Sequence, residues 1–190
     1  MPWLGLAAVA TATATGVARA AESTIYPGVG IGKVKLGMTQ AQVKRALGGW
    51  RFVDERNGGH LSVGWGFGEW SADFVNGRVV EVATTLQSQR TPTRIGPGST
   101  WRALVRAYPN GVCTANYESG WSGRHEYLVP HKGGTQTIYW VRRRPYRAGE
   151  TPPPFLVAEV HVRTRWAALP EFQPSWNAHC STDWRTADHP

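Results

Sequence analysis

Gly37-Met38-Thr39-Gln40-Ala41-Gln42-Val43-Lys44-Arg45-Ala46-Leu47-Gly48-Gly49 is the stretch that decides the fold, because it predicts a short helix with signals at both ends. Thr39 and Gln42 have the spacing of a capping box, in which each side chain accepts a hydrogen bond from the other residue's backbone N–H. Val43 and Leu47 lie on one apolar face, and the two terminal glycines end the helix. The stretch therefore predicts a helix that packs one face against another element.

A second copy of this pattern occurs later in the chain. It is Gly98-Ser99-Thr100-Trp101-Arg102-Ala103-Leu104-Val105-Arg106-Ala107-Tyr108, and both copies fit Gly-x-Thr-x-x-x-(Val/Leu)-x-Arg-Ala-(Leu/Tyr). A pair of matching strands follows in the same order, since Val79-Val80-Glu81-Val82 is similar to Val157-Ala158-Glu159-Val160. Two landmarks in the same order predict an internal repeat.

Between the two helices the hydrophobic pattern changes to a period of two, which predicts strands. The bulky positions, which we expect in the core, are Leu61, Val63, Trp65, Phe67, Trp70, Ala72 and Phe74. Asn76-Gly77 is a strong hairpin signal, and the returning strand has Val80, Val82, Thr84 and Leu86 on one side. We interpret Arg51–Gly59 as a polar connection, so the first half is a helix followed by three antiparallel strands.

The second half predicts the same order of elements. After the second helix we expect strands over His125–Val129, Gln136–Arg142 and Phe155–Thr164. A polar linker with prolines, Gln87–Gly98, separates the halves, and Glu22–Lys35 is an extended lead-in that finishes in a short strand. We therefore predict an α+β fold of two tandem repeats, each a short helix followed by an antiparallel meander, with both helices on one face of the sheet.

The first twenty residues predict an export signal. Leu4–Val9 is apolar, and Ala18-Arg19-Ala20 has the small residues at which a signal peptidase cleaves. A membrane anchor is the alternative, but the apolar run is shorter than the roughly 20 residues that a spanning helix needs. We expect a secreted chain without a membrane span after cleavage. Its segments are the signal over 1–20, a first repeat over 21–90, a second repeat over 91–165 and a tail over 166–190.

Cys113 and Cys180 are the two cysteines of the chain, and in an exported protein they predict one disulfide. The bond would tie the tail to the loop after the second helix and contribute about 4 kcal/mol in the chain-entropy model. Two free thiols are the alternative. Neither His125 with His131 nor His179 with Cys180 has a second pair at zinc-site spacing, so we expect no metal and no cofactor.

The run Gly32–Gly48, followed by Phe74-x-x-Gly77-x-Val79, resembles the unit of the SmpA/OmlA-type outer-membrane-assembly lipoproteins. Two such units in an exported chain resemble the β-lactamase inhibitor protein family. In that family, two helix-plus-four-strand repeats form one curved sheet with helices on its convex side, and the concave, aromatic-rich side binds a target protein. The resemblance implies an inhibitor-like protein-binding module. The inhibitors carry a disulfide in each repeat, and no stretch here matches their active-site loop, so no functional residue is carried over.

The charge and the aromatic residues of the chain favour binding over catalysis. The formal net charge of +8 favours acidic partners, and neither a phosphate-binding glycine loop nor a Gly-x-Ser-x-Gly elbow is present. Arg, Trp and Tyr dominate protein interface hot spots. We predict a non-enzymatic module that recognises another protein through the bare sheet face and a basic loop. The candidate contact residues are Tyr139, Trp140, Arg142, Arg143, Arg144, Tyr146, Glu159, His161 and Arg163.

Two other functions are alternatives. The arginine cluster could instead bind an anionic cell-surface polymer; the same composition suits single-stranded nucleic acid, but export argues against that partner. Glu159, His161 and Arg163 alternate along the last strand and share one face, and a Glu/His pair can do acid–base work in a hydrolase. Catalysis needs a pocket that gathers groups from several elements, so we prefer solvent exposure or partner contact for these residues.

Overall fold

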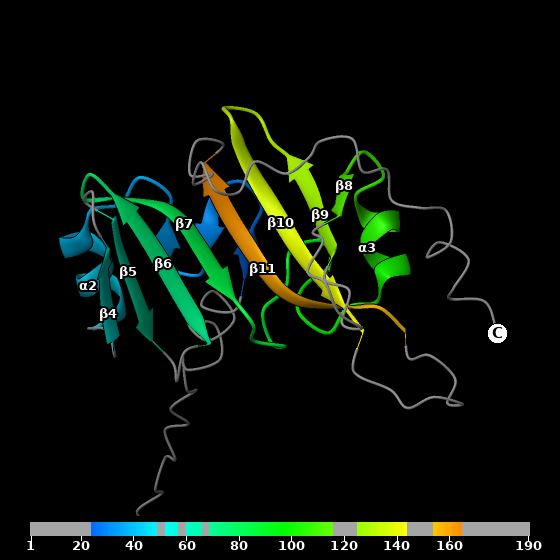
Figure 1. Ribbon diagram of the computed structural model, residues 1–190, viewed down its shortest axis with the longest axis horizontal. Helices are drawn as coiled ribbons and strands as arrows, with labels where there is room; N and C mark the ends of the chain where they lie inside the picture. The colour runs from blue at the N-terminus through cyan, green and yellow to red at the C-terminus, as the bar shows by residue number, and fades with distance from the viewer. Residues whose placement is uncertain are drawn as a thin grey trace, which may run out of the picture.

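A computed structural model describes residues 24–48, 52–56, 60–65, 69–115, 125–143 and 154–164. Antiparallel strands make up most of this part of the chain, together with two short helices, which confirms the α+β class (Figure 1). Within these ranges, no helix is both long enough and apolar enough to cross a membrane.

One eight-stranded antiparallel sheet forms the centre of the fold (Figure 1). Its strands are β4 (Phe52–Arg56), β5 (His60–Trp65), β6 (Trp70–Val75), β7 (Arg78–Thr84), β8 (Val112–Ala115), β9 (His125–Pro130), β10 (Thr135–Arg142) and β11 (Leu156–Thr164). Their order in space is β4-β5-β6-β7-β11-β10-β9-β8. The last strand of the first half, β7, therefore pairs with the last strand of the second half, β11, and this pairing joins the halves.

The helices are α2 (Gln40–Leu47) and α3 (Trp101–Ala107). The capping box predicted for α2 is present: the Thr39 side chain accepts from Gln42 N at 3.3 Å, and Thr39 N donates to the Gln42 side chain at 2.8 Å. Gly48 ends α2 with a φ of 70°, and Val43 is fully buried. α3 has only the simpler cap, in which the Thr100 side chain accepts from Ala103 N.

A second, small sheet is formed by the lead-in, where a single short strand was expected. It consists of β1 (Ile25–Tyr26), β2 (Gly30–Ile31) and β3 (Val34–Lys35). The turn between β1 and β2 is fixed to the large sheet, because Gly28 N donates to the Thr137 hydroxyl at 3.0 Å. A Cβ on Gly28 would lie 2.7 Å from the His131 ring, so this contact requires glycine.

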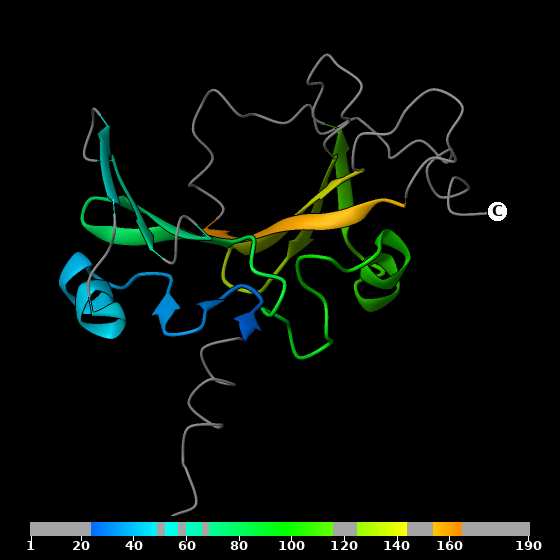
Figure 2. The same cartoon turned by 90° about the horizontal axis from the view of Figure 1, so that it is seen from below.

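All of these elements lie on one side of the large sheet. Figure 2 shows α2, α3 and the small sheet on the same face, and the large sheet curves so that its concave side points away from them. The core fills the space between the sheet and this layer. The prediction that both helices share one face of the sheet is therefore confirmed.

The core includes Trp70, Ala72 and Phe74, as their alternation predicts. The predicted core positions Trp65 and Phe67 fall outside the side chains that the structure describes. The expectation for Val80 is wrong. A bulge opposite Asp73 and Phe74 adds one residue to β7, so Val79 enters the core while Val80 is only half-buried.

The sequence-based strand count is also corrected, because four strands rather than three follow each helix. β4 occupies the interval that we interpreted as a polar connection, and β8 follows α3 directly. Among the strands that the structure describes, both are outermost and have a hydrogen-bonded neighbour on one side only. Edge strands are often short and charged, so they lack the alternation of a half-buried strand. The interpretation of the two halves as tandem repeats stays a prediction, as do the domain boundaries.

Candidate functional site

The sheet face that points away from the helices carries polar residues from the two central strands. Side chains alternate along a strand, and the flanking Val160 and Val162 are fully buried in the core. Glu159, His161 and Arg163 therefore share the opposite face, as their spacing predicts. Glu81 of β7 lies on this face as well, directly across from Arg163.

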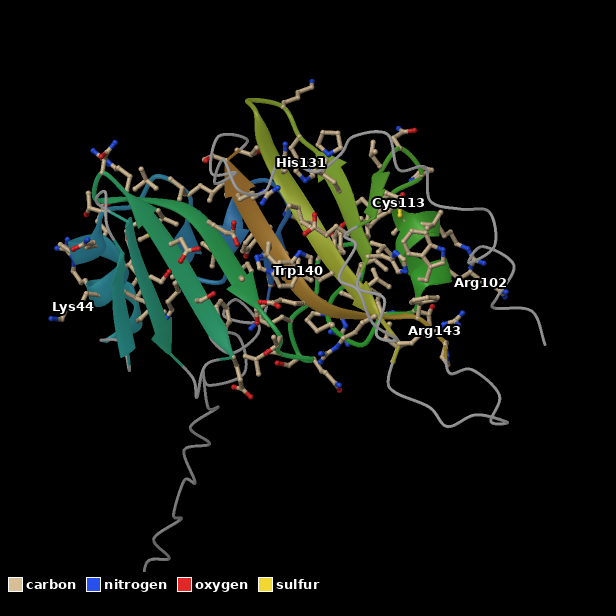
Figure 3. The ribbon with its side chains drawn as sticks, viewed as in Figure 1. Lys44, Arg102, Cys113, His131, Trp140 and Arg143 are labelled. Carbon is tan, nitrogen blue, oxygen red and sulfur yellow. The ribbon has the colours of Figure 1, made fainter. Side chains whose placement is uncertain are left out.

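His161 lies at the centre of this group and contacts one glutamate from each half of the sheet. Its Nδ1 lies 2.5 Å from Glu81 Oε1, and its Nε2 lies 3.2 Å from Glu159 Oε1. The first contact is a hydrogen bond; the second is an ion pair by distance without the geometry of a hydrogen bond. The Trp140 ring stacks on the imidazole, with 4.0 Å between centroids and 36° between planes. Figure 3 shows Trp140 over the middle of the sheet.

This environment keeps His161 protonated. Burial by itself lowers the pKa of His161, but the charge of Glu81 and the contacts with both carboxylates outweigh burial and raise the pKa to about 9. At neutral pH the imidazole is therefore a cation between two glutamates. A protonated imidazole has no lone pair for a proton, so the geometry disfavours His161 as a general base.

The basic residues at the end of β10 have different environments. Arg142 is exposed, whereas the Arg143 guanidinium lies 4.0 Å above the Phe155 ring. Burial and the charge of Arg143 lower the pKa of His125, whose ring packs edge-on against Phe155. Arg143 therefore stacks on its own chain, and Figure 3 shows it at one end of the sheet.

Three of the predicted contact residues cannot be placed on the proposed surface. Arg144 and Tyr146 lie outside the described residues. Tyr139 is described, but it is fully buried on the helix side, where its ring lies 5.5 Å from that of Tyr108. The expectation that Tyr139 contacts a partner is therefore wrong. Adjacent strand residues point to opposite faces, so Trp140 and Tyr139 cannot both be on the surface.

Two acidic residues of this face were absent from the sequence prediction. Glu81 lies 80 positions before His161, yet it corresponds to Glu159 in the match between the two strand motifs, and that match was the available signal. Glu126 of β9 is the cross-strand neighbour of Trp140, on the side away from Glu159. Trp140 is thus flanked by one carboxylate residue on each neighbouring strand.

The described residues include no group of three or more His, Cys, Asp or Glu that could hold a metal ion. Cys113 lies in β8, but Cys180 falls outside the described ranges, so the disulfide between them stays a prediction.

Comparison with known proteins gives no family. No family model matches the chain, and no curated protein matches it either. One similar solved structure is an extracellular protein containing an SCP domain from Bacillus anthracis str. Ames, with 8% identity and a TM-score of 0.46 over 68% of this chain. The match covers 44% of that protein, so the chain spans less than half of its length.

A second similar structure is the uncharacterized protein YfeY from Escherichia coli. It has 12% identity and a TM-score of 0.48, over 75% of this chain and 99% of that one. At this level of similarity, neither structure supports an inference about function.

Proposed function

We propose that the chain is an exported, non-enzymatic binding module that recognises another protein through the sheet face opposite the helices. The observation that carries the proposal is the setting of Trp140. Its ring is held against the buried imidazole of His161, and Glu159 and Glu126 flank it on the neighbouring strands. A large aromatic side chain in a fixed position loses little conformational entropy on binding, which is the property of an interface anchor.

The proposed architecture supports a protein as the partner. We interpret residues 21–90 and 91–165 as tandem repeats, because each helix precedes four strands and the repeated strands β7 and β11 pair at the centre. The resemblance to the β-lactamase inhibitor protein family implies a protein target for such a pair. The proposal does not extend to a lactamase, because no stretch matches the inhibitors' active-site loop. Export and the Cys113–Cys180 disulfide belong to the same proposal.

The two alternatives have less support from the geometry. A hydrolase that uses His161 as its general base has less support, because His161 is held as a cation. A polymer-binding surface would need several free cations, and of the two described arginines in the cluster, Arg143 stacks on Phe155 while Arg142 is exposed. We therefore keep the anionic polymer as an outcome of the test rather than as a second proposal.

The test is affinity capture from the secreted and wall fractions of the producing organism, with immobilised wild type, Trp140→Ala and Tyr26→Ala. Tyr26 is a matched control, because it is an aromatic residue with 37% exposure in the small sheet on the other side of the molecule. We expect Trp140→Ala to lose a protein that wild type and Tyr26→Ala both retain.

The same capture distinguishes the other outcomes. An identical set of proteins on all three surfaces would refute the role of Trp140. If the captured material is a polymer that 0.5 M salt releases, the polymer alternative is correct, because phosphate or carboxylate contacts by arginine are strongly screened. Circular dichroism of each variant establishes that the fold is intact before capture.

A further inference from the structure

The charges of the described residues are divided between the two sides of the large sheet. Residues 24–48 and 85–111 include α2, α3 and the small sheet, and these two stretches contain Lys and Arg but no Asp or Glu. Their basic side chains are all exposed except that of Arg90, which is half-buried. They are Lys33, Lys35, Lys44, Arg45, Arg90, Arg94, Arg102 and Arg106. We call these residues the basic layer.

The described acidic side chains lie mostly on the other side of the sheet. They alternate with core residues along β6, β7, β9 and β11, so they point away from the helices. These residues are Asp73, Glu81, Glu126 and Glu159. Glu69, in the connection before β6, is the exception. Arg163 shares the face of the acidic residues, so that face carries both signs, whereas residues 24–48 and 85–111 carry positive charge alone.

The basic layer points outward from all three elements. Arg45 follows the core residue Val43 by two positions, and Arg106 follows Leu104 by the same interval. Two residues turn a helix by about 200°, so both arginines lie opposite the buried side of their helix, and both are exposed. Lys35 points outward from the small sheet, because its neighbour Val34 is in the core and successive strand residues point to opposite sides.

These cations are spread over the length of the molecule. Figure 2 shows α2 and α3 towards opposite ends of the large sheet, with the small sheet between them. Lys44 and Arg102 show the same separation, since they lie at opposite ends of the molecule in Figure 3. The positive charge therefore covers an extended surface rather than the end of one helix.

The electrostatics of the helix ends does not account for the basic layer. Cations are favourable in the last turn of a helix, which suits Lys44, Arg45 and Arg106. The same effect favours carboxylates in the first turn, yet neither helix has one there, and Arg102 is in the first turn of α3. Charges of one sign also repel one another and destabilise the compact state. A partner of opposite charge would relieve this repulsion.

We propose that the basic layer binds the surface of an anionic lipid bilayer. A bilayer is a plane of negative charge, and α2, the small sheet and α3 form one layer on the same side of the molecule (Figure 2). The outward cations of all three elements can therefore approach the headgroups together, within a Debye length of about 8 Å at physiological ionic strength. A linear polyanion contacts only the cations along its own path, so a lipid surface fits the extended layer better.

The basic layer is separate from the surface proposed for the protein partner. When the basic layer lies on the bilayer, the sheet face that carries Trp140 points away from the membrane. The module would then present this face to a protein partner while its helix side holds it at the membrane. The lipid proposal does not rest on the protein partner, because it is argued from the charge of the helix side alone.

The test measures sedimentation of the full chain with lipid vesicles. One kind of vesicle contains phosphatidylglycerol mixed with phosphatidylcholine, and the other contains phosphatidylcholine alone. The double variant Arg45→Gln/Arg106→Gln removes two outward charges, and glutamine is a good helix former, so the helices are kept. Lys132→Gln/Arg142→Gln is the matched control, because it removes the same charge from exposed residues of the β9–β10 turn and of β10.

We expect wild type to bind the vesicles with phosphatidylglycerol but not those of phosphatidylcholine alone, and added salt to weaken the binding. One Lys or Arg near an anionic membrane surface contributes about fivefold in affinity. Arg45→Gln/Arg106→Gln should therefore lower the partition coefficient by at least about tenfold. The control should stay within about twofold of wild type, because its residues lie outside the basic layer.

Either of two wild-type results would overturn the proposal: no binding to the vesicles with phosphatidylglycerol, or equal binding to both kinds of vesicle. Wild type needs no substitution, so the proposal can fail on these results alone. An equal loss in both double variants would also overturn it, since only the net charge would then matter. At equal phosphate concentration, stronger binding to long-chain polyphosphate than to vesicles would assign the basic layer to a soluble polymer instead. Circular dichroism establishes that each variant is folded.

Discussion

The substitution Glu81→Gln tests whether the buried charge cluster joins the two halves of the sheet. Glu81 belongs to the first half, His161 to the second, and their contact of 2.5 Å lies beside the β7–β11 pairing. The substitution removes the negative charge that contributes most to raising the pKa of His161, while it nearly preserves the volume of the side chain. Its effect should therefore appear as a change in how stability depends on pH.

The size of the effect follows from the pKa of His161. A pKa of about 9 in the folded chain, against the ordinary 6.5, corresponds to about 3 kcal/mol of folding free energy. Because the folded pKa is raised, this stabilisation is fully present below pH 6.5 and is lost as the pH rises through 9. The wild-type free energy of unfolding should therefore fall by about 3 kcal/mol between pH 6 and pH 10 through this group.

In Glu81→Gln the pKa of His161 should fall towards its ordinary value, since burial then opposes the charged form with one carboxylate fewer. We expect most of the pH dependence assigned to His161 to disappear, and stability at pH 6 to decrease by a similar amount. Arg163, the cross-strand neighbour of Glu81, and Glu159 remain in both proteins. The comparison therefore isolates the Glu81 carboxylate.

The assay is urea unfolding at pH 6, 7.5, 9 and 10, together with an NMR titration of the His161 ring. Glu126→Gln is the matched control, because Glu126 is on the same face but on β9, two strands away from β11. Glu126→Gln should leave the pH dependence of the free energy of unfolding unchanged. A His161 pKa below 7 in wild type, or the same pH slope in wild type and Glu81→Gln, would refute the reasoning.

Three further predictions concern the scaffold, and each is measured by urea unfolding at pH 7. Thr39→Ala removes the capping box of α2 and should cost about 1 kcal/mol; no loss would mean that the box is not formed. Phe74→Ala should cost about 3–5 kcal/mol, whereas Val80→Ala should cost clearly less, and the reverse order would contradict the position of the bulge. Gly28→Ala should destabilise by more than 1 kcal/mol, because φ is 71° and a Cβ would lie within 2.8 Å of His131; an unchanged stability would show that the turn can move.

Signals between residues close in the sequence predicted local structure correctly. The spacing of Thr39 and Gln42 predicted the capping box of α2, and the alternation of Trp70, Ala72 and Phe74 predicted their burial. These features depend on hydrogen bonds and side-chain directions within one element. They are therefore set before the elements pack together.

The predictions failed where a second strand determines the outcome. The sequence of the edge strand β4 has no alternating hydrophobic pattern, so it was not recognised as a strand. Only its hydrogen-bonded pairing with β5 identifies it as one. The bulge that places Val79 rather than Val80 in the core exists only in the register between β6 and β7. Tyr139 and Trp140 carry equal aromatic signals, and only the packing of the helices decides which of them is buried.

In the candidate site, too, some features are set within one strand and others only by the pairing of two strands. The sequence by itself determined that Glu159, His161 and Arg163 share one face of a strand, because alternation is a property of the strand alone. Only the tertiary structure brought Glu81 to His161, since the β7–β11 pairing joins residues 80 positions apart. That contact changed the chemistry, because two carboxylates from different halves hold a buried imidazole as a cation, and neither half contains the complete set of charges.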